Sequence, residues 1–79
     1  MRLDKFLKVS RLIKRRSVAK EMVDAGRVQV NGKPAKPGTD VKIGDKLEIG
    51  YGDNAVKAEI LEIRETVKAE EAKNLYRIL

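Results

Sequence analysis

Apolar residues at the start of the chain follow the period of an α-helix. Together with one serine they recur at steps of three and four, at Leu3, Phe6, Leu7 and Ser10. This period predicts a short amphipathic helix over residues 2–9, with its apolar face toward the core and its charged residues in solvent. Asp4 falls in the first turn, where a carboxylate suits the positive end of the helix dipole.

A second helical pattern covers residues 15–25. The side chains predicted to face the core are Val18, Ala19, Met22 and Val23. Gly26 follows, and a glycine there can take the left-handed conformation that ends many helices. The sequence therefore predicts two short helices in succession before any strand.

The start of the second helix lacks the usual capping chemistry. No Ser, Thr or Asp stands at the cap position, and the residues there are Lys14, Arg15 and Arg16. Cations at a helix N-terminus oppose the dipole, at a cost of about 0.3–1 kcal/mol each. A bound phosphate would accept the free N–H groups and neutralise the cations. We interpret this helix start as a candidate phosphate site, with Arg16 as the leading contact and Ser17 in support, because a guanidinium can engage two phosphate oxygens.

After residue 27 the apolar period changes from helical to alternating. Residues 28–30 and 33–35 predict a hairpin, because Asn31-Gly32 between them favours a tight turn. Pro34 has no amide hydrogen, so the second of these strands is expected at a sheet edge. Two longer strands follow, over residues 46–51 and 55–63, and a turn at Gly52, Asp53 and Asn54 joins them.

The last part of the chain returns to a helical pattern. Thr66 is placed to cap a helix over residues 67–79. Its predicted inward stripe is Ala69, Ala72, Leu75, Tyr76 and Leu79. The order of elements predicts an α+β fold in a single domain of residues 1–79: two N-terminal helices packed on a small, mainly antiparallel sheet, with a short C-terminal helix.

Positive charge is concentrated in the N-terminal half. Residues 1–36 contain eleven Lys or Arg and three Asp or Glu, a net +8, whereas residues 37–79 contain seven and nine, a net −2, which together make the formal +6 of the chain. Eight cations lie in the predicted helices and the segment between them: Arg2, Lys5, Lys8, Arg11, Lys14, Arg15, Arg16 and Lys20. Such a surface favours a phosphate backbone as its partner. With three aromatic residues in all, the chain suits backbone contacts in structured RNA better than stacking on unpaired bases.

The residue types that are missing argue against several functions. The chain has no Cys and no His, which removes disulfides, the commonest general base and the commonest transition-metal ligand. We therefore expect a non-enzymatic binding protein without a cofactor or a metal. No apolar run reaches the roughly 18 residues that span a membrane. The basic start is not followed by the apolar region of a secretory signal, so a cytoplasmic protein is expected, with a monomer as the simplest state.

Four stretches within residues 1–50 follow the order of a known RNA-binding domain: Arg2-Leu3-Asp4-Lys5-Phe6-Leu7, Arg15-Arg16-Ser17-Val18-Ala19-Lys20, Gly26-Arg27-Val28-Gln29-Val30-Asn31-Gly32 and Val41-Lys42-Ile43-Gly44-Asp45. They resemble the domain named after the fourth protein of the small ribosomal subunit, the S-four domain. Residues 1–50 would form its core motif, and residues 55–79 a C-terminal strand and helix. With its ending at residues 70–79 included, the whole chain resembles the bacterial RqcP-like family of ribosome-associated quality control and, more distantly, the heat-shock protein fifteen family.

The resemblance implies a role in the rescue of stalled ribosomes. RqcP-like proteins bind free large subunits that carry an obstructed peptidyl-tRNA. They contact large-subunit rRNA and the tRNA, while an RqcH-like partner supports C-terminal alanine tailing of the nascent chain. The contacts implied on this chain lie on the first two helices: Arg2, Lys5, Lys8, Arg11, Arg15, Arg16 and Lys20. Many S-four domains have a Ser or Thr in place of Lys14, so this position departs from the pattern. Asp4 is expected to orient Arg2, Lys5 or a helix end, because a carboxylate repels phosphate.

Three other interpretations stay open at this point. One is a general module for structured RNA, whose affinity would be set mainly by salt. Another is a factor like heat-shock protein fifteen, which recycles large subunits without tailing. The third is a peripheral membrane module, which is disfavoured because the apolar residues of the two helices are needed for the small core.

Overall fold

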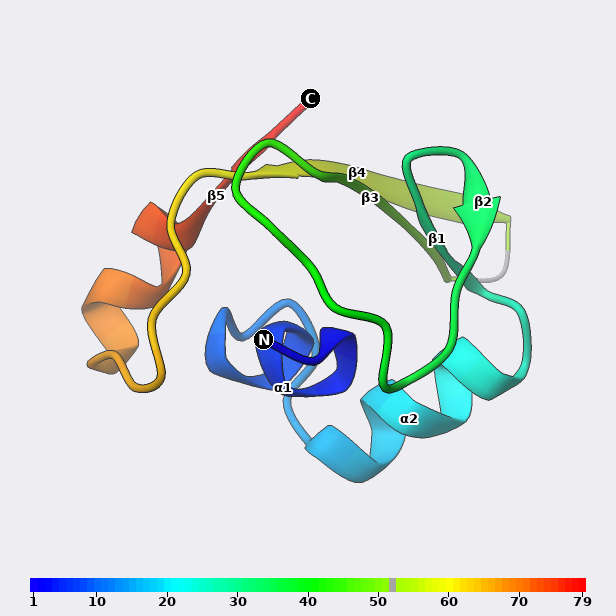
Figure 1. The fold of residues 1–79 in the computed structure, drawn as a ribbon, viewed down its shortest axis with the longest axis horizontal. Coiled ribbons are helices and arrows are strands. Elements are labelled where there is room, and N and C mark those ends of the chain that lie inside the picture. Colours follow the sequence, from blue (N-terminus) through cyan, green and yellow to red (C-terminus); the bar gives the residue numbers. More distant parts are fainter. Residues whose placement is uncertain (52) are drawn as a thin grey trace.

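Two helices at the start of the chain lie on one side of a five-stranded antiparallel sheet in the computed structural model, which describes residues 1–51 and 53–79 (Figure 1). Helix α1 spans Leu3–Val9 and helix α2 spans Arg16–Asp24. Both predicted helices are confirmed, with bounds that differ by one residue. Gly26, with φ of 75°, takes the left-handed conformation expected just after α2.

The sheet has the strand order β2-β1-β3-β4-β5, and every neighbouring pair is antiparallel. The described strands are β1 Val28–Val30, β2 Lys33–Pro34, β3 Lys46–Tyr51, β4 Asn54–Ile60 and β5 Tyr76–Ile78. The predicted hairpin is confirmed, since Asn31 and Gly32 both have positive φ and join β1 to β2. Pro34 lies in the edge strand β2, as its missing amide hydrogen requires. In the turn predicted between β3 and β4, Gly52 lies outside the described residues.

The core lies between the helices and the inner face of the sheet. Its fully buried side chains come from the two helices, from the strands and from residue 75 near the C-terminus. They include Leu3, Phe6, Leu7, Ala19, Val28, Leu47, Ile49, Ile60 and Leu75. Phe6 is therefore a core residue, as its place on the apolar stripe predicts. On β3 the buried Leu47 and Ile49 alternate with Glu48, which pairs with Lys57 of β4 on the outer face.

The predicted short C-terminal helix is present, but its predicted bounds of residues 67–79 are wrong. The structure has a 3-10 helix, η1, at Ala69–Leu75, followed directly by strand β5. Of the predicted stripe, Ala72 and Leu75 are buried; they are three residues apart, which matches the three-residue turn of a 3-10 helix. Tyr76 and the residues after it pair with β4, whose backbone would otherwise form an open sheet edge.

Two further predictions need correction. Val18 is 40% exposed and does not face the core. At about 100° per residue it lies beyond Met22 on the helix circumference, away from the buried Ala19 and Val23. Strand β4 ends at Ile60 instead of residue 63, because the next two N–H groups both donate to the Leu75 carbonyl oxygen of η1. No helix in the described ranges 1–51 and 53–79 has the length and apolarity that a membrane crossing requires.

Candidate nucleic-acid interface

The first residues of the chain are held by a later loop. The N–H groups of Leu3 and Asp4 donate to the carbonyl oxygens of Thr39 and Pro37, at 2.8 and 3.1 Å. The N-terminal amine forms an ion pair with Asp40 at 2.7 Å, and this hydrogen-bonded contact lowers the pKa of the Asp40 carboxyl. These bonds satisfy two N–H groups at the start of α1 and fix its first turn. The backbone at the start of α1, which carries Arg2 and Lys5, is therefore anchored to the loop at residues 37–40.

A buried carboxylate in that turn joins two of the predicted contact residues. The Asp4 side chain is 4% exposed and accepts hydrogen bonds from Arg2 Nε at 3.2 Å, Arg2 Nη2 at 3.1 Å and Arg16 Nη2 at 3.4 Å. It also accepts the N–H of Lys5 at 2.8 Å. Burial acts to raise the pKa of Asp4, but the bonds from Arg2 and Arg16 outweigh burial and hold the pKa below its ordinary value. Asp4 is charged at neutral pH and orients both arginines, as predicted for Arg2.

Arg2 and Arg16, which we call the arginine pair, keep much of their surface in solvent. Their side chains are 54% and 48% exposed, and Asp4 occupies only some of the five N–H donors of each guanidinium. The guanidinium carbon of Arg2 also lies 3.7 Å from where a Cβ on Gly38 would be, so Arg2 packs against that loop. Two planar cations at the starts of two helices are thus held by one carboxylate, with donors left for an external anion.

Lys5 is engaged differently from the arginine pair. Its ammonium forms an ion pair with Glu65, sixty residues away in the chain, and this contact lowers the pKa of Glu65. The charge of Lys5 is therefore partly compensated within the protein. Sequence spacing gave no indication of this pair.

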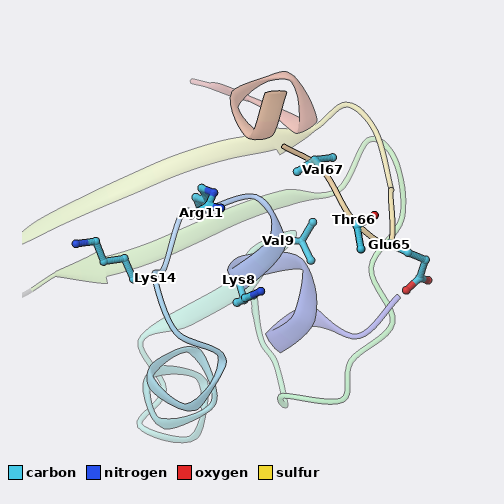
Figure 2. A pocket seen from close by; sticks show the side chains of 7 residues that line it. All are labelled: Lys8, Val9, Arg11, Lys14, Glu65, Thr66 and Val67. Atoms are coloured by element: carbon cyan, nitrogen blue, oxygen red, sulfur yellow. The ribbon is translucent and has the colours of Figure 1, made fainter. Parts of the chain in front are cut away.

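The other five predicted contacts are exposed and have no ion pair within residues 1–51 and 53–79: Lys8, Arg11, Lys14, Arg15 and Lys20. Three of them, Lys8, Arg11 and Lys14, line an open hollow of about 190 Å³ between the connection of the two helices and residues 65–67 (Figure 2). The predicted cations therefore divide into the arginine pair, the compensated Lys5, the three cations of the hollow, Arg15 at the cap of α2 and Lys20 on α2.

The start of α2 has the uncapped character expected from the sequence. Arg15 is at the cap position with an extended backbone, no side chain caps the helix, and the first turn contains no acid. Ser17 is exposed in that turn and makes no cap hydrogen bond. The helix start thus presents free N–H groups beside Arg15 and Arg16, which is an electrostatic arrangement suited to an anion. Within the described part of the chain, no group of three or more acidic side chains is placed to hold a metal ion.

The family model of the S4 domain matches residues 1–47. The chain belongs to the S4 domain family. It is 56% identical, over all of its length and 92% of the relative, to the "RQC P-site tRNA stabilizing factor" of Bacillus subtilis. It is 33% identical to the "Heat shock protein 15 homolog" of Aeromonas salmonicida, over 87% of this chain and 52% of that protein. A trimeric structure of Heat Shock Protein 15 from Vibrio cholerae superposes with a TM-score of 0.92 at 39% identity, covering all of this chain and 81% of the other.

These likenesses confirm the S4-like α+β fold and the resemblance inferred from the four sequence stretches. All eight predicted cations lie within the matched S4 segment. Three residues that the sequence does not place at the site lie beyond it: Glu65, which pairs with Lys5, and Thr66 and Val67, which line the hollow. The sequence predicts Thr66 as a helix cap, but the residue at the cap position of η1 is Lys68. These three are brought to the S4 segment by the path of the chain after β4, for which the local sequence contains no signal.

Proposed function

We propose that this S4 protein binds free large ribosomal subunits that carry an obstructed peptidyl-tRNA and stabilises that tRNA in the peptidyl site. It contacts large-subunit rRNA and the tRNA, and it catalyses no reaction. An RqcH-like partner then performs alanine tailing of the stalled chain. The name of the Bacillus subtilis relative, at 56% identity over the whole chain, supports the assignment to quality control and to the peptidyl-site tRNA.

The observation that carries the proposal is the arginine pair beside the uncapped start of α2. Asp4 fixes Arg2 and Arg16 so that their remaining donors face solvent, next to the free N–H groups of a helix N-terminus. Rigid guanidiniums lose less side-chain entropy on binding than mobile lysines do, and their fork matches two phosphate oxygens. A surface of this kind suits the backbone of folded RNA, in which phosphate positions are set by the RNA structure.

Recycling of large subunits without tailing is the second candidate. The Vibrio cholerae Heat Shock Protein 15 structure, which covers the whole chain at a TM-score of 0.92, favours it. The Aeromonas salmonicida relative, however, is matched over 52% of its length, whereas the Bacillus subtilis factor is matched over 92%. The extent of the match therefore favours the first candidate.

Sedimentation with purified large subunits tests the proposal. The protein should co-sediment preferentially with subunits that carry peptidyl-tRNA over empty ones at near-physiological salt. Arg16→Ala should weaken this association by about tenfold, the value of one charge-assisted contact. Lys73→Ala is the matched control, since Lys73 is an exposed cation in η1, on the other half of the chain. Equal binding to both kinds of subunit would refute peptidyl-tRNA recognition, and no binding to either would refute the ribosomal partner.

A further inference from the structure

The hollow lined by Lys8, Arg11 and Lys14 has two chemically different walls. Figure 2 shows Lys8, Arg11 and Lys14 toward one side and Thr66 and Val67 across from them. Val9 lies between, and both valines pack partly against the core. One wall is cationic, and the other offers aliphatic surface and a hydroxyl.

The charge of the hollow is not balanced from within. Lys8, Arg11 and Lys14 have no ion pair among the described residues. Glu65, the one acid in the lining, forms its ion pair with Lys5. Cations that line one hollow without a compensating acid repel one another, and a bound anion lowers that repulsion.

The backbone at Arg11 places a cation where a glycine is usual. Ser10 is the C-cap of α1, and Arg11 follows it with φ of 61°, in the left-handed region. Its N–H donates to the Lys8 carbonyl oxygen at 3.0 Å, a bond typical of a helix end that terminates in this conformation. A non-glycine residue there costs conformational free energy, and such strain concentrates at functional positions. Arg11 is among the residues that line the hollow.

The size and lining of the hollow select the occupant. Its volume of about 190 Å³ is below the roughly 300–1,000 Å³ of pockets for drug-sized ligands. A bare phosphate would use the cationic wall and leave the valines and the Thr66 hydroxyl without a role. A nucleobase would need an aromatic platform, and the lining contains none. A sugar with its phosphate matches both walls.

We propose that the hollow binds one ribose–phosphate unit of an RNA strand, with the phosphate at Lys8, Arg11 and Lys14 and the ribose on Val9, Val67 and Thr66. This inference deepens the proposed function and rests on it for the presence of RNA at this face. The site does not read the base. It distinguishes RNA from DNA, because the 2′-hydroxyl can hydrogen-bond with the Thr66 hydroxyl.

Two short oligonucleotides that differ in the 2′-hydroxyl test this site: oligouridine RNA and oligodeoxyuridine of the same length. Both are titrated into the full chain, and the methyl groups of Val9 and Val67 are followed by NMR. RNA should shift both sets of methyl signals, and DNA should bind more weakly. Equal affinity for the two oligonucleotides, or RNA binding that leaves these methyl groups unshifted, would overturn the assignment. Inorganic phosphate is the third titrant, and if it shifts the methyl signals as far as RNA does, the hollow is a site for a free anion.

Variants test separately the cationic charge of the hollow, the Thr66 hydroxyl and the backbone strain at Arg11. Arg11→Gly should weaken RNA binding about tenfold and lower the salt slope by about 0.7, without lowering the melting temperature, since glycine accepts this backbone. Lys14→Ala should also weaken RNA binding, and it replaces Arg11→Gly as the test of charge if that variant folds poorly. Thr66→Val should weaken binding of RNA about threefold to tenfold and leave DNA binding unchanged. Losses no larger than that of Lys73→Ala would refute the inference.

The two proposals fail in different experiments. If the hollow does not bind RNA, the wild-type protein still prefers loaded large subunits and Arg16→Ala still weakens that preference. If the ribosomal function is wrong, the preference for loaded subunits is absent in the wild-type protein itself, whatever the oligonucleotides show.

Discussion

Replacement of the buried carboxylate, Asp4→Asn, separates two explanations of the basic surface. Simple electrostatics predicts that the loss of one acid raises the net charge from +6 to +7 and tightens RNA binding. The structure predicts the reverse, because Asp4 holds Arg2 and Arg16 in place through three hydrogen bonds. We expect RNA binding to weaken.

The size of the effect follows from the contacts. Releasing two half-exposed arginines costs about 0.5–1.5 kcal/mol each when they must be ordered again on binding. The added charge returns somewhat less than 1 kcal/mol at a screened surface. The net loss is about 1 kcal/mol, or roughly fivefold in affinity. The free energy of unfolding should fall by about 2 kcal/mol. The Asn amide keeps one acceptor oxygen but loses the ion pairs with Arg2 and Arg16, and these pairs are only moderately strong because both arginines are half exposed.

The variant should remain folded at 25 °C, because a domain of 79 residues has about 4–12 kcal/mol of stability. Circular dichroism checks the fold and the melting temperature, and fluorescence anisotropy with a structured RNA measures affinity at several salt concentrations. Lys73→Ala serves as a variant that changes charge away from the pair. Tighter binding by folded Asp4→Asn would refute the orienting role.

The same carboxylate makes stability depend on pH in a defined direction. The pKa of Asp4 is lower in the folded state than its ordinary value, because the bonds from Arg2 and Arg16 outweigh burial. Its contribution is therefore present above the unfolded-state pKa of about 4 and is lost as the pH falls through the folded-state value. Wild type should lose stability in that window, and Asp4→Asn should lose less; parallel urea titrations of the two proteins from pH 6 downward provide the comparison.

Three further outcomes are expected. Affinity for structured RNA should fall steeply with salt, with a slope of about −4 to −5 if roughly five phosphates are contacted; a nearly flat plot of binding against salt would exclude phosphate as the main partner. Gly26→Ala should destabilise the protein by about 1 kcal/mol through backbone strain alone, since φ is 75° and no atom lies within 4 Å of the added Cβ; unchanged urea denaturation would contradict this. Leu75→Ala should lower the free energy of unfolding by about 2–5 kcal/mol, because Leu75 is 1% exposed. Leu79→Ala should change it by less than about 0.5 kcal/mol, because Leu79 is 55% exposed. Similar losses for the two variants in thermal melts would contradict the observed burial of Leu75 and exposure of Leu79.

The elements that the sequence predicts well are those with local causes. Helices α1 and α2 follow from apolar spacing over single turns, and Asn31-Gly32 needs nothing beyond its own backbone preference. The C-terminal segment has a non-local cause. Its stripe fits an α-helix as well as a 3-10 helix, and the choice is made by Tyr76–Ile78 pairing with β4. The spacing of apolar residues in one sequence does not reveal that pairing, so it predicts a helix that continues past Leu75.

The candidate site divides in the same way. The identities of the eight cations and the missing cap of α2 can be predicted from composition and spacing. How the cations are arranged cannot, because the deciding contacts are long-range: Asp4 reaches Arg16 across twelve positions and Glu65 reaches Lys5 across sixty. The proposed role of Arg11 depends on its positive φ, which the sequence does not predict because non-glycine residues rarely adopt that conformation.

The small size of the domain explains why a core residue of α1 also takes part in the proposed binding surface. Four of the seven residues of α1 are buried, and one of these four is Asp4, so the acid that orients the arginine pair is itself part of the packed layer. The orientation of Arg2 and Arg16 is therefore as rigid as the core beneath it, which a carboxylate on a mobile loop would not provide. Two of the cations of the hollow, Lys8 and Arg11, lie instead in the last turn of the same helix and just after its C-cap. A change in the packing of α1 should therefore move both parts of the surface together, whereas a change in any one exposed lysine should not.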